Sequence, residues 1–325
     1  MNLPNRVFIL FIISLIVVTL GAIELLPLLK VEPSLPVRPH TKTEIGTTSF
    51  PHQLHDAVGN TLIIASYPQR IVSHTLGTDE ILLALCPISH IVALSAFSRD
   101  VRYSNVVDKA RTIAGQTSDN VEHILSFNPD LIFVASYSRV ETVELLQSIG
   151  APVFRFANFQ SIADIKNNIK TIGYAIGEEQ RAAVLIAQME RAIKIIRAGI
   201  PNNAVPPRIM SYTSDNYTAG SHTIFDSMVN IVGGINVVAE HGIAYHVKIS
   251  EEQILAWQPD FIVTHAYQSK FAEARNQLLE NPTIAASAAG KNGRIIVIDN
   301  RHFMSVSQYI VYGIKKLFDG LYPTH

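Results

Sequence analysis

Aromatic and imidazole side chains follow the β-rich runs of this 325-residue chain, where a ligand would meet the ends of strands. In open parallel sheets, ligands bind beyond the carboxyl ends of the strands. Rings at these positions bind a flat or large molecule by stacking and by a few hydrogen bonds. The candidate ligand-binding residues are His74, Phe97, Tyr137 and Arg139, followed in the second half of the chain by Tyr212, Tyr217, Tyr245, His246, His265, Tyr267 and Arg301.

The same histidines are open to a second chemistry. Imidazoles on converging loops can complete a metal site, and His74, His246 and His265 are the candidates among the 12 histidines. No tight ligand spacing accompanies them, so a zinc- or manganese-binding protein is kept as the alternative function.

Catalysis is the third reading, with His74 or His265 as the acid or base of a chelatase-like enzyme. The G-x-S-x-G, G-x-G-x-x-G, G-x-x-x-x-G-K-[ST] and H-E-x-x-H motifs are all missing from the sequence. The pattern therefore favours binding without chemistry, and we expect neither an enzyme nor a cofactor.

Composition limits the partners of the chain. The 26 basic and 27 acidic side chains give a formal net charge of -1, so no basic surplus is present to neutralise a phosphate backbone. We expect no nucleic-acid partner. The single cysteine, Cys86, excludes an internal disulfide framework and a Cys-rich metal site. At this length, with 48% hydrophobic residues, about two domains are expected.

The N-terminal residues carry the clearest local signal. Arg6 precedes an uncharged run over residues 7–23 that only Ser14 and Thr19 interrupt. We expect residues 1–30 to be a signal peptide or an uncleaved membrane anchor, and the protein to be periplasmic or otherwise extracytoplasmic. Residues 31–48 contain three prolines and predict an extended spacer.

Beyond the spacer, β-rich runs alternate with helical stretches. Residues 53–64 predict a hairpin with Gly59 and Asn60 in the turn. The alternation that follows is typical of an α/β fold with a largely parallel sheet. Strands are expected at 70–73, 91–94, 131–135, 153–156, 208–212, 261–264 and 295–298, and helices at 79–85, 121–127 and 140–149.

A long helix divides the chain. From Glu178 onward the amphipathic pattern predicts one helix of about twenty residues, or roughly 30 Å, which Pro201, Pro206 and Pro207 end. Such a helix can bridge two lobes. The expected organisation is an N-terminal lobe at 49–158, a helical segment between the lobes at 159–200 and a C-terminal lobe at 201–325.

An internal repeat supports two lobes of similar build. The nine residues 124–132, ILSFNPDLI, recur 130 positions later at 254–262 as ILAWQPDFI. The match extends forward to Tyr137 and Tyr267 and back to Glu122 and Glu252. A weaker echo pairs residues 70–75 with 208–213. Several ordered matches on either side of a long helix indicate a duplicated architecture.

These motifs resemble a known family. The runs RIVS at 70–73, TDEILLAL at 78–85 and IVALS at 91–95 are similar to the opening of ABC-importer solute-binding proteins for iron-siderophores, haem and cobalamin. NPDLI at 128–132 and QPDFI at 258–262 resemble the family's helix-to-strand junctions. GGINV at 233–237, after Phe225, and ISEEQIL at 249–255 resemble its second lobe. The resemblance covers about residues 50–320.

The resemblance implies two Rossmann-like lobes joined by a rigid long helix, with limited hinge motion and the ligand held between the lobes. It implies a monomer that delivers a ferric chelate, haem or corrinoid to an ABC permease. In this family one glutamate on the outer face of each lobe meets arginines of the permease, and the resemblance assigns these roles to Glu80 and Glu252. Cobalamin-binding members carry a tryptophan before the second-lobe Ser-Glu segment, where this chain has Tyr245 and His246, so the choice of ligand stays open.

Overall fold

Two parallel sheets organise the residues that the computed structural model describes, 49–56 and 59–323. The signal or anchor expected at residues 1–30 and the spacer expected at 31–48 lie outside the described residues. Both sheets belong to one compact unit of the chain. Among the described residues, no helix is long and apolar enough to cross a membrane.

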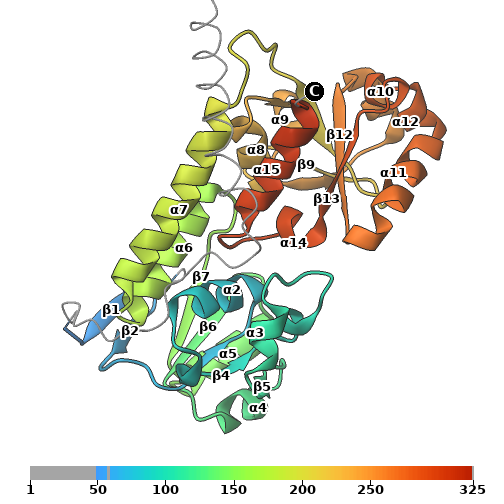
Figure 1. The fold of residues 1–325 in the computed structure, drawn as a ribbon. Helices are drawn as coiled ribbons and strands as arrows, with labels where there is room; N and C mark the ends of the chain where they lie inside the picture. The colour runs from blue at the N-terminus through green and yellow to red at the C-terminus, as the bar shows by residue number, and fades with distance from the viewer. Residues whose placement is uncertain (1–48, 57–58, 324–325) are drawn as a thin grey trace, which may run out of the picture. The chain divides into compact units, whose positions relative to one another are not determined.

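The first lobe is built on five parallel strands in the order β5-β4-β3-β6-β7 (Figure 1). Short apolar runs form these strands, and all five residues of β6 are buried. The strands are β3 (Ile71–Ser73), β4 (Ile91–Leu94), β5 (Gly115–Gln116), β6 (Leu131–Ala135) and β7 (Val153–Phe156). The helices between them are α2 (Leu76–Leu85), α3 (Val107–Arg111), α4 (Val121–Ser126) and α5 (Val140–Ser148).

The second lobe repeats this plan with four parallel strands in the order β10-β8-β12-β13. The strands are β8 (Arg208–Ser211), β10 (Ile235–Asn236), β12 (Phe261–Ala266) and β13 (Ile295–Asp299). The helices are α8 (Ile224–Ile231), α9 (Val237–Glu240), α10 (Glu251–Trp257), α11 (Phe271–Glu280), α12 (Pro282–Ala286), α13 (Ala288–Lys291), α14 (Asn300–Phe303) and α15 (Ile310–Leu321). The expected parallel α/β architecture is therefore confirmed.

Two antiparallel pairs stand apart from the sheets. β1 (His52–His55) pairs with β2 (Thr61–Ile64), which confirms the expected hairpin. β9 (Tyr217–Ala219) pairs with β11 (His246–Lys248) in the second lobe. Sequence patterning did not predict this second pair, because its strands are only three residues long and lie far apart in the chain, ending at Ala219 and beginning at His246.

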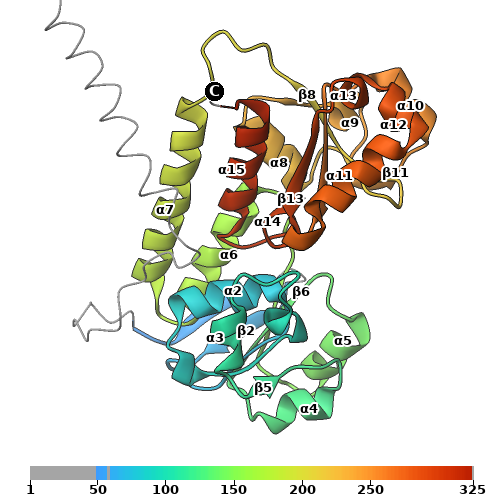
Figure 2. The ribbon, with the colours of Figure 1, turned by 45° about the vertical axis from the view of Figure 1, so that its right-hand side comes forward.

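The long helix lies where the sequence predicts it. α6 (Ile162–Ala175) and α7 (Glu179–Ala198) lie side by side (Figures 1 and 2). α6 packs against β1 and α2 of the first lobe, whereas α7 also packs against α8 and α15 of the second lobe. α7 therefore joins the two lobes.

The repeated motif acts in the same way in both lobes. Asn128 and Gln258 adopt left-handed backbone conformations, with φ of 48° and 45°, where each helix turns into the following strand. The carboxylate of Asp130 then accepts hydrogen bonds from the backbone N–H groups of Gln69 and Arg70 at 2.7 and 2.9 Å. In the second lobe the carboxylate of Asp260 accepts one from Arg208 N–H at 2.9 Å. The aspartates thus align the starts of neighbouring strands.

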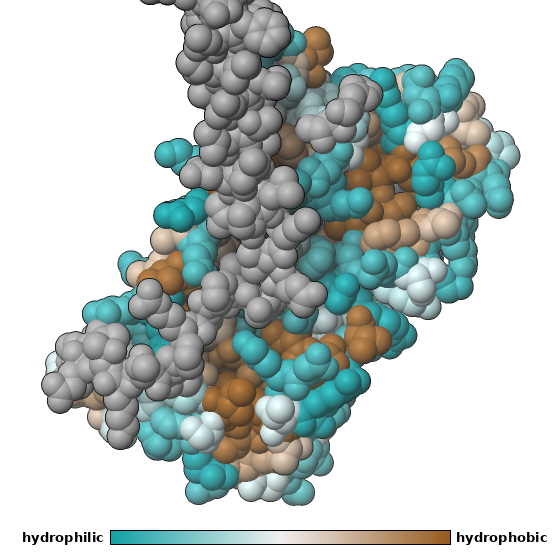
Figure 3. All heavy atoms as spheres, viewed as in Figure 1, coloured by the Kyte–Doolittle hydropathy of each residue, from teal (hydrophilic) through white to brown (hydrophobic). Residues whose placement is uncertain are grey.

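Each lobe has its own apolar core. One cluster packs Val72 and Ile132 of the first sheet against Ile124 and Leu146 of the helices α4 and α5. Another packs the second sheet against α9, α10 and α12. On the face drawn in Figure 3, polar side chains cover most of the surface and apolar areas lie between them on both lobes.

The contact between α6 and α7 depends on Gly173. A Cβ at this position would overlap the Cβ of Ala182, which is buried on α7. We expect Gly173→Val to lower the free energy of unfolding by about 1–3 kcal/mol, the usual cost of overpacking. Ala183→Val, at an exposed position of α7, is the matched control and should change stability little. Equal urea midpoints for the two variants would contradict this account of the helix contact.

Candidate functional site

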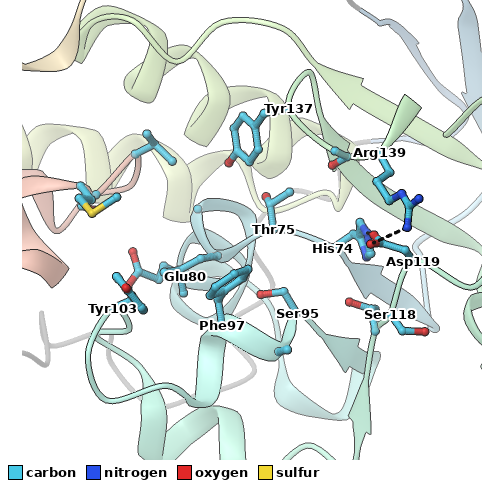
Figure 4. A pocket seen from close by; sticks show the side chains of 18 of the residues that line it. His74, Thr75, Glu80, Ser95, Phe97, Tyr103, Ser118, Asp119, Tyr137 and Arg139 are labelled. Atoms are coloured by element: carbon cyan, nitrogen blue, oxygen red, sulfur yellow. Dashed lines mark hydrogen bonds and ion pairs between the residues drawn. The ribbon is translucent and has the colours of Figure 1, made fainter. Parts of the chain in front are cut away.

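A hollow of about 730 Å³ lies at the carboxyl ends of the first-lobe strands (Figure 4). Strand order explains its place, because β3 lies between β4 and β6 and the chain leaves β3 and β6 in different directions. The hollow is lined mainly by His74, Thr75, Glu80, Ser95, Phe97, Tyr103, Ser118, Asp119, Tyr137 and Arg139, with Arg301, Met304, Ser305 and Val306 from the second lobe. The sequence predicts five of these residues: His74, Phe97, Tyr137, Arg139 and Arg301.

Two exposed rings supply the apolar part of this first hollow. Phe97 and Tyr137 keep 58% and 59% of their surface exposed, so part of each ring is accessible to a ligand. Phe97 meets Tyr103 edge to face at 6.2 Å, and Tyr137 meets Phe159 at 5.1 Å. Loss of solvation raises the pKa of the Tyr137 hydroxyl to about 12, so the hydroxyl is neutral at physiological pH. Neutral rings suit stacking on an uncharged or delocalised face.

A polar edge bounds the same hollow. Asp119 is the shared partner of two side chains, with His74 Nε2 at 3.3 Å and Arg139 Nη1 at 3.7 Å from its carboxylate oxygens (Figure 4). The other ring nitrogen of His74, Nδ1, is buried and has no hydrogen-bond partner among the described residues. Arg301 is held by two hydrogen bonds of 2.8 and 2.9 Å to Asp299. These groups are preorganised for hydrogen bonds to a ligand's polar periphery.

A second hollow, of about 440 Å³, opens on the second-lobe sheet. It contains the five predicted residues Tyr212, Tyr217, Tyr245, His246 and His265. Met304, Ser305 and Val306 line both hollows, so the two adjoin along this segment. Phe159 and Gln160, which precede α6, complete the lining of the second hollow from the other side.

The five predicted residues of the second hollow play different parts. Tyr212 is buried and donates its hydroxyl to Asn216 at 2.5 Å, and His265 stacks on Phe303 and hydrogen-bonds Asn300. These two shape the wall. Tyr217, Tyr245 and His246 are exposed and are therefore available to a ligand.

His222 also lines the second hollow, although its sequence context does not single it out. Its ring stacks on Tyr245 with centroids 5.7 Å apart, and both residues have left-handed backbones, with φ of 58° and 64°. Backbone hydrogen bonds from Gly220 to Tyr245 and from Tyr245 to Ser221 hold the strained pair in place. Such strain is found at functional sites. The only signal in the sequence was an imidazole after Gly220-Ser221, which predicts nothing by itself.

Tyr267 lines neither hollow, although the repeat pairs it with Tyr137. The structure therefore does not bring Tyr267 to the predicted site.

The three histidines that were candidate metal ligands do not lie together. His74 lies in the first hollow, and His246 and His265 lie in the second. Within 49–56 and 59–323, no three His, Cys, Asp or Glu side chains are grouped so that they could hold a metal ion.

Comparison with known proteins decides the family. The model of the family described as "Periplasmic binding protein" matches residues 71–302, which is more than half of the chain. The chain belongs to the periplasmic binding protein family. It is therefore the solute-binding component of an ABC importer, acts outside the cytoplasm, and works with a permease and a small-molecule ligand.

Several relatives of this binding protein share most of its length. It is 25% identical over 281 residues to the cobalamin-binding protein of Halobacterium salinarum, covering 85% of this chain and 75% of the relative. It is 25% identical over 292 residues to an uncharacterised ABC transporter substrate-binding lipoprotein of Bacillus subtilis, covering 87% and 89%. The periplasmic heme-binding protein RhuT from Roseiflexus sp. RS-1 superposes with a TM-score of 0.67 at 25% identity, covering 78% and 98%.

One residue of this binding protein departs from the predicted role. Glu80 does not lie on an outer face: it is 2% exposed, and Asn105 and Ser307 donate hydrogen bonds to its carboxylate. The prediction that it presents a carboxylate to the permease is therefore wrong. The sequence placed it near the start of a helix, and the groups that cover it are 25 and 227 residues away in the chain.

Burial also changes the titration of this carboxyl. It raises the pKa of Glu80 from 4.5 to about 7, against the opposing effect of the hydrogen bonds from Ser307 and Asn105. A carboxyl whose pKa is higher in the folded state binds its proton more tightly there. Its contribution to stability is therefore present below pH 4.5 and is lost as the pH rises towards 7. Asp79, which is also buried, follows the same trend with a pKa of about 7.

Glu80→Gln should remove part of this pH dependence. Between pH 5 and pH 8 the wild-type protein should lose more unfolding free energy than the variant, by up to about 3 kcal/mol. Urea unfolding of both proteins across this range measures the difference. Parallel stability curves would show that Glu80 does not titrate in this window. Glu252→Gln, at an exposed carboxylate, is the control and should leave the wild-type slope unchanged.

Proposed function

We propose that the chain binds a corrinoid across the two adjoining hollows and delivers it to the permease of a corrinoid importer. The supporting observation is the pair of hollows that meet at Met304, Ser305 and Val306. One hollow offers the exposed rings of Phe97 and Tyr137, and the other offers Tyr217 and Tyr245. Exposed rings with polar groups beside them fit a large, nearly flat macrocycle that carries many amide groups.

The chemistry of the lining favours a corrinoid over the other two ligand classes. A corrinoid brings its own ligands to its metal, so it requires stacking and hydrogen bonds rather than a protein–metal bond. Haem iron is usually held by a histidine or tyrosine. In the first hollow His74 Nε2 contacts Asp119 and the other ring nitrogen, Nδ1, is buried. A ferric siderophore of negative charge calls for free cations, whereas Arg139 and Arg301 are both paired with carboxylates.

A specific observation supports haem as the second candidate. Tyr245, His246 and His222 are exposed around the second hollow, and any of them offers an atom that binds iron. The relative of known structure with 25% identity is a heme-binding protein. The ligand panel below separates the two candidates.

Because Glu80 is buried, another glutamate of the first lobe must contact the permease, and the internal repeat indicates which one. Glu122 and Glu252 occupy matched places in the two copies, each in the first turn of its helix, α4 or α10. Both are exposed. We propose that this pair, one glutamate on each lobe, meets basic residues of the permease and fixes the register of docking. Export through residues 1–30, and action as a monomer, are parts of the same proposal.

Calorimetric titration of the purified full chain tests the ligand. We expect cyanocobalamin to bind at 1:1, and Tyr137→Ala and Tyr245→Ala each to weaken it by about tenfold, the loss of one buried ring contact. Tyr267→Ala is the matched control, because this tyrosine lies outside both hollows. Binding of hemin in place of cyanocobalamin, lost in a Tyr245 or His246 variant, would replace the corrinoid with haem.

Uptake tests the docking pair. Glu122→Ala together with Glu252→Ala should abolish corrinoid uptake by cells that depend on this chain and leave the affinity unchanged, because neither residue lines a hollow. Glu144→Ala with Glu280→Ala removes one exposed glutamate from each lobe and serves as the control. Normal uptake in the first double variant, or weakened binding, would count against the assignment.

A further inference from the structure

A buried polar contact joins the two lobes beside the hollows. Glu80 of the first lobe accepts a hydrogen bond from Ser307 Oγ of the second lobe, with Oε2 at 2.5 Å. Gln308 Nε2 donates to the backbone oxygen of Glu80 at 2.9 Å. Ser307 and Gln308 are fully buried, and Glu80 nearly so. Water is therefore excluded from a contact that the two lobes make together.

Asn105 ties a third segment to this contact. Its Nδ2 donates to Glu80 Oε1 at 2.8 Å and to the backbone oxygen of Arg301 at 3.0 Å. Its backbone N–H also donates to Glu80 Oε1, at 3.0 Å. Asn105 thus contacts both the carboxylate of Glu80 in the first lobe and helix α14 of the second lobe. Separation of the lobes would break all of the bonds that cross between them.

The same stretch of chain lines the ligand hollows. Met304, Ser305 and Val306, which both hollows share, directly precede Ser307 and Gln308. Val306 also packs closely on Gly77 at the start of α2, where a Cβ would lie 2.5 Å from Val306 Cγ2. A displacement of this stretch by a ligand must therefore move the partners of Glu80. A movement at the hollows and a movement at the contact with Glu80 are therefore expected to occur together.

We propose that Glu80, Asn105 and Ser307 form a latch between the lobes that sets their angle and slows the escape of bound ligand. This inference rests on the proposed function only in taking the hollows as the ligand site. Glu80 is a positioning residue here: it acts through the segment that it holds. Loss of the latch should widen the range of lobe angles and speed ligand dissociation.

Distances between the lobes test the latch without any ligand. Spin labels at Lys109→Cys on α3 and Ala286→Cys on α12 report on the two lobes, since both positions are exposed and the native Cys86 is buried. We expect Ser307→Ala and Glu80→Ala to broaden the distance distribution measured by pulsed electron resonance, and the two changes combined to broaden it no further. Glu80→Gln keeps acceptor and donor capacity and should stay close to the wild-type width.

Ser307→Ala is the decisive variant, because it removes a single oxygen and leaves the fold's larger contacts intact. Glu122→Ala, an exposed glutamate of the same lobe, is the control and should leave the distribution unchanged. A wild-type width in both Ser307→Ala and Glu80→Ala would overturn the latch.

Dissociation of cyanocobalamin adds a kinetic readout. In Ser307→Ala we expect the dissociation rate to rise about tenfold, with little change in the association rate. If wild-type protein fails to bind cyanocobalamin while the label distances broaden as expected, the latch stands and the proposed ligand fails. If binding is tight but Ser307→Ala alters neither the distances nor the dissociation rate, the ligand stands and the latch fails.

Discussion

The carboxylates of Asp130 and Asp260 provide the constraint on which both halves of the site depend. Each accepts hydrogen bonds from the backbone at the start of a neighbouring strand, so adjacent parallel strands begin together. Because these strands run parallel from aligned starts, the loops that follow them leave the same edge of the sheet. The hollows lie at these edges because the register upstream is fixed. The two copies of the motif therefore share the same hydrogen-bonding role in the two lobes.

Much of the fold could be predicted because short stretches of sequence carry its signals. The α7 helix runs over residues 179–198, within one residue of the prediction, since its amphipathic period and the following prolines are local signals. The short strands β5 and β9 were missed, since two or three residues carry no readable period. Their place is decided by the neighbours they pair with, which tertiary structure alone supplies.

The sequence predicted which residues lie at the hollows, but not what each of these residues does there. Ten of the eleven predicted ligand residues line one of the two hollows, because the rule about strand ends places loops without knowledge of their packing. Tyr267 is the exception, and two further residues show what local sequence does not reveal. Glu80 has the sequence context of a solvated helix start, yet partners 25 and 227 residues away cover it. His222 becomes notable only through its stack on Tyr245, which is 23 residues away.

The buried carboxyl also explains how two sheets can belong to one compact unit. Burying Glu80 costs free energy, which its raised pKa records, and hydrogen bonds from both lobes offset part of that cost. An apolar contact could hold the lobes together with a smaller desolvation cost. It would fix the angle between them less well, because the hydrophobic effect is non-directional. Directed hydrogen bonds to one carboxylate favour a single angle. A single angle also fixes how the two hollows, which share Met304, Ser305 and Val306, lie relative to each other.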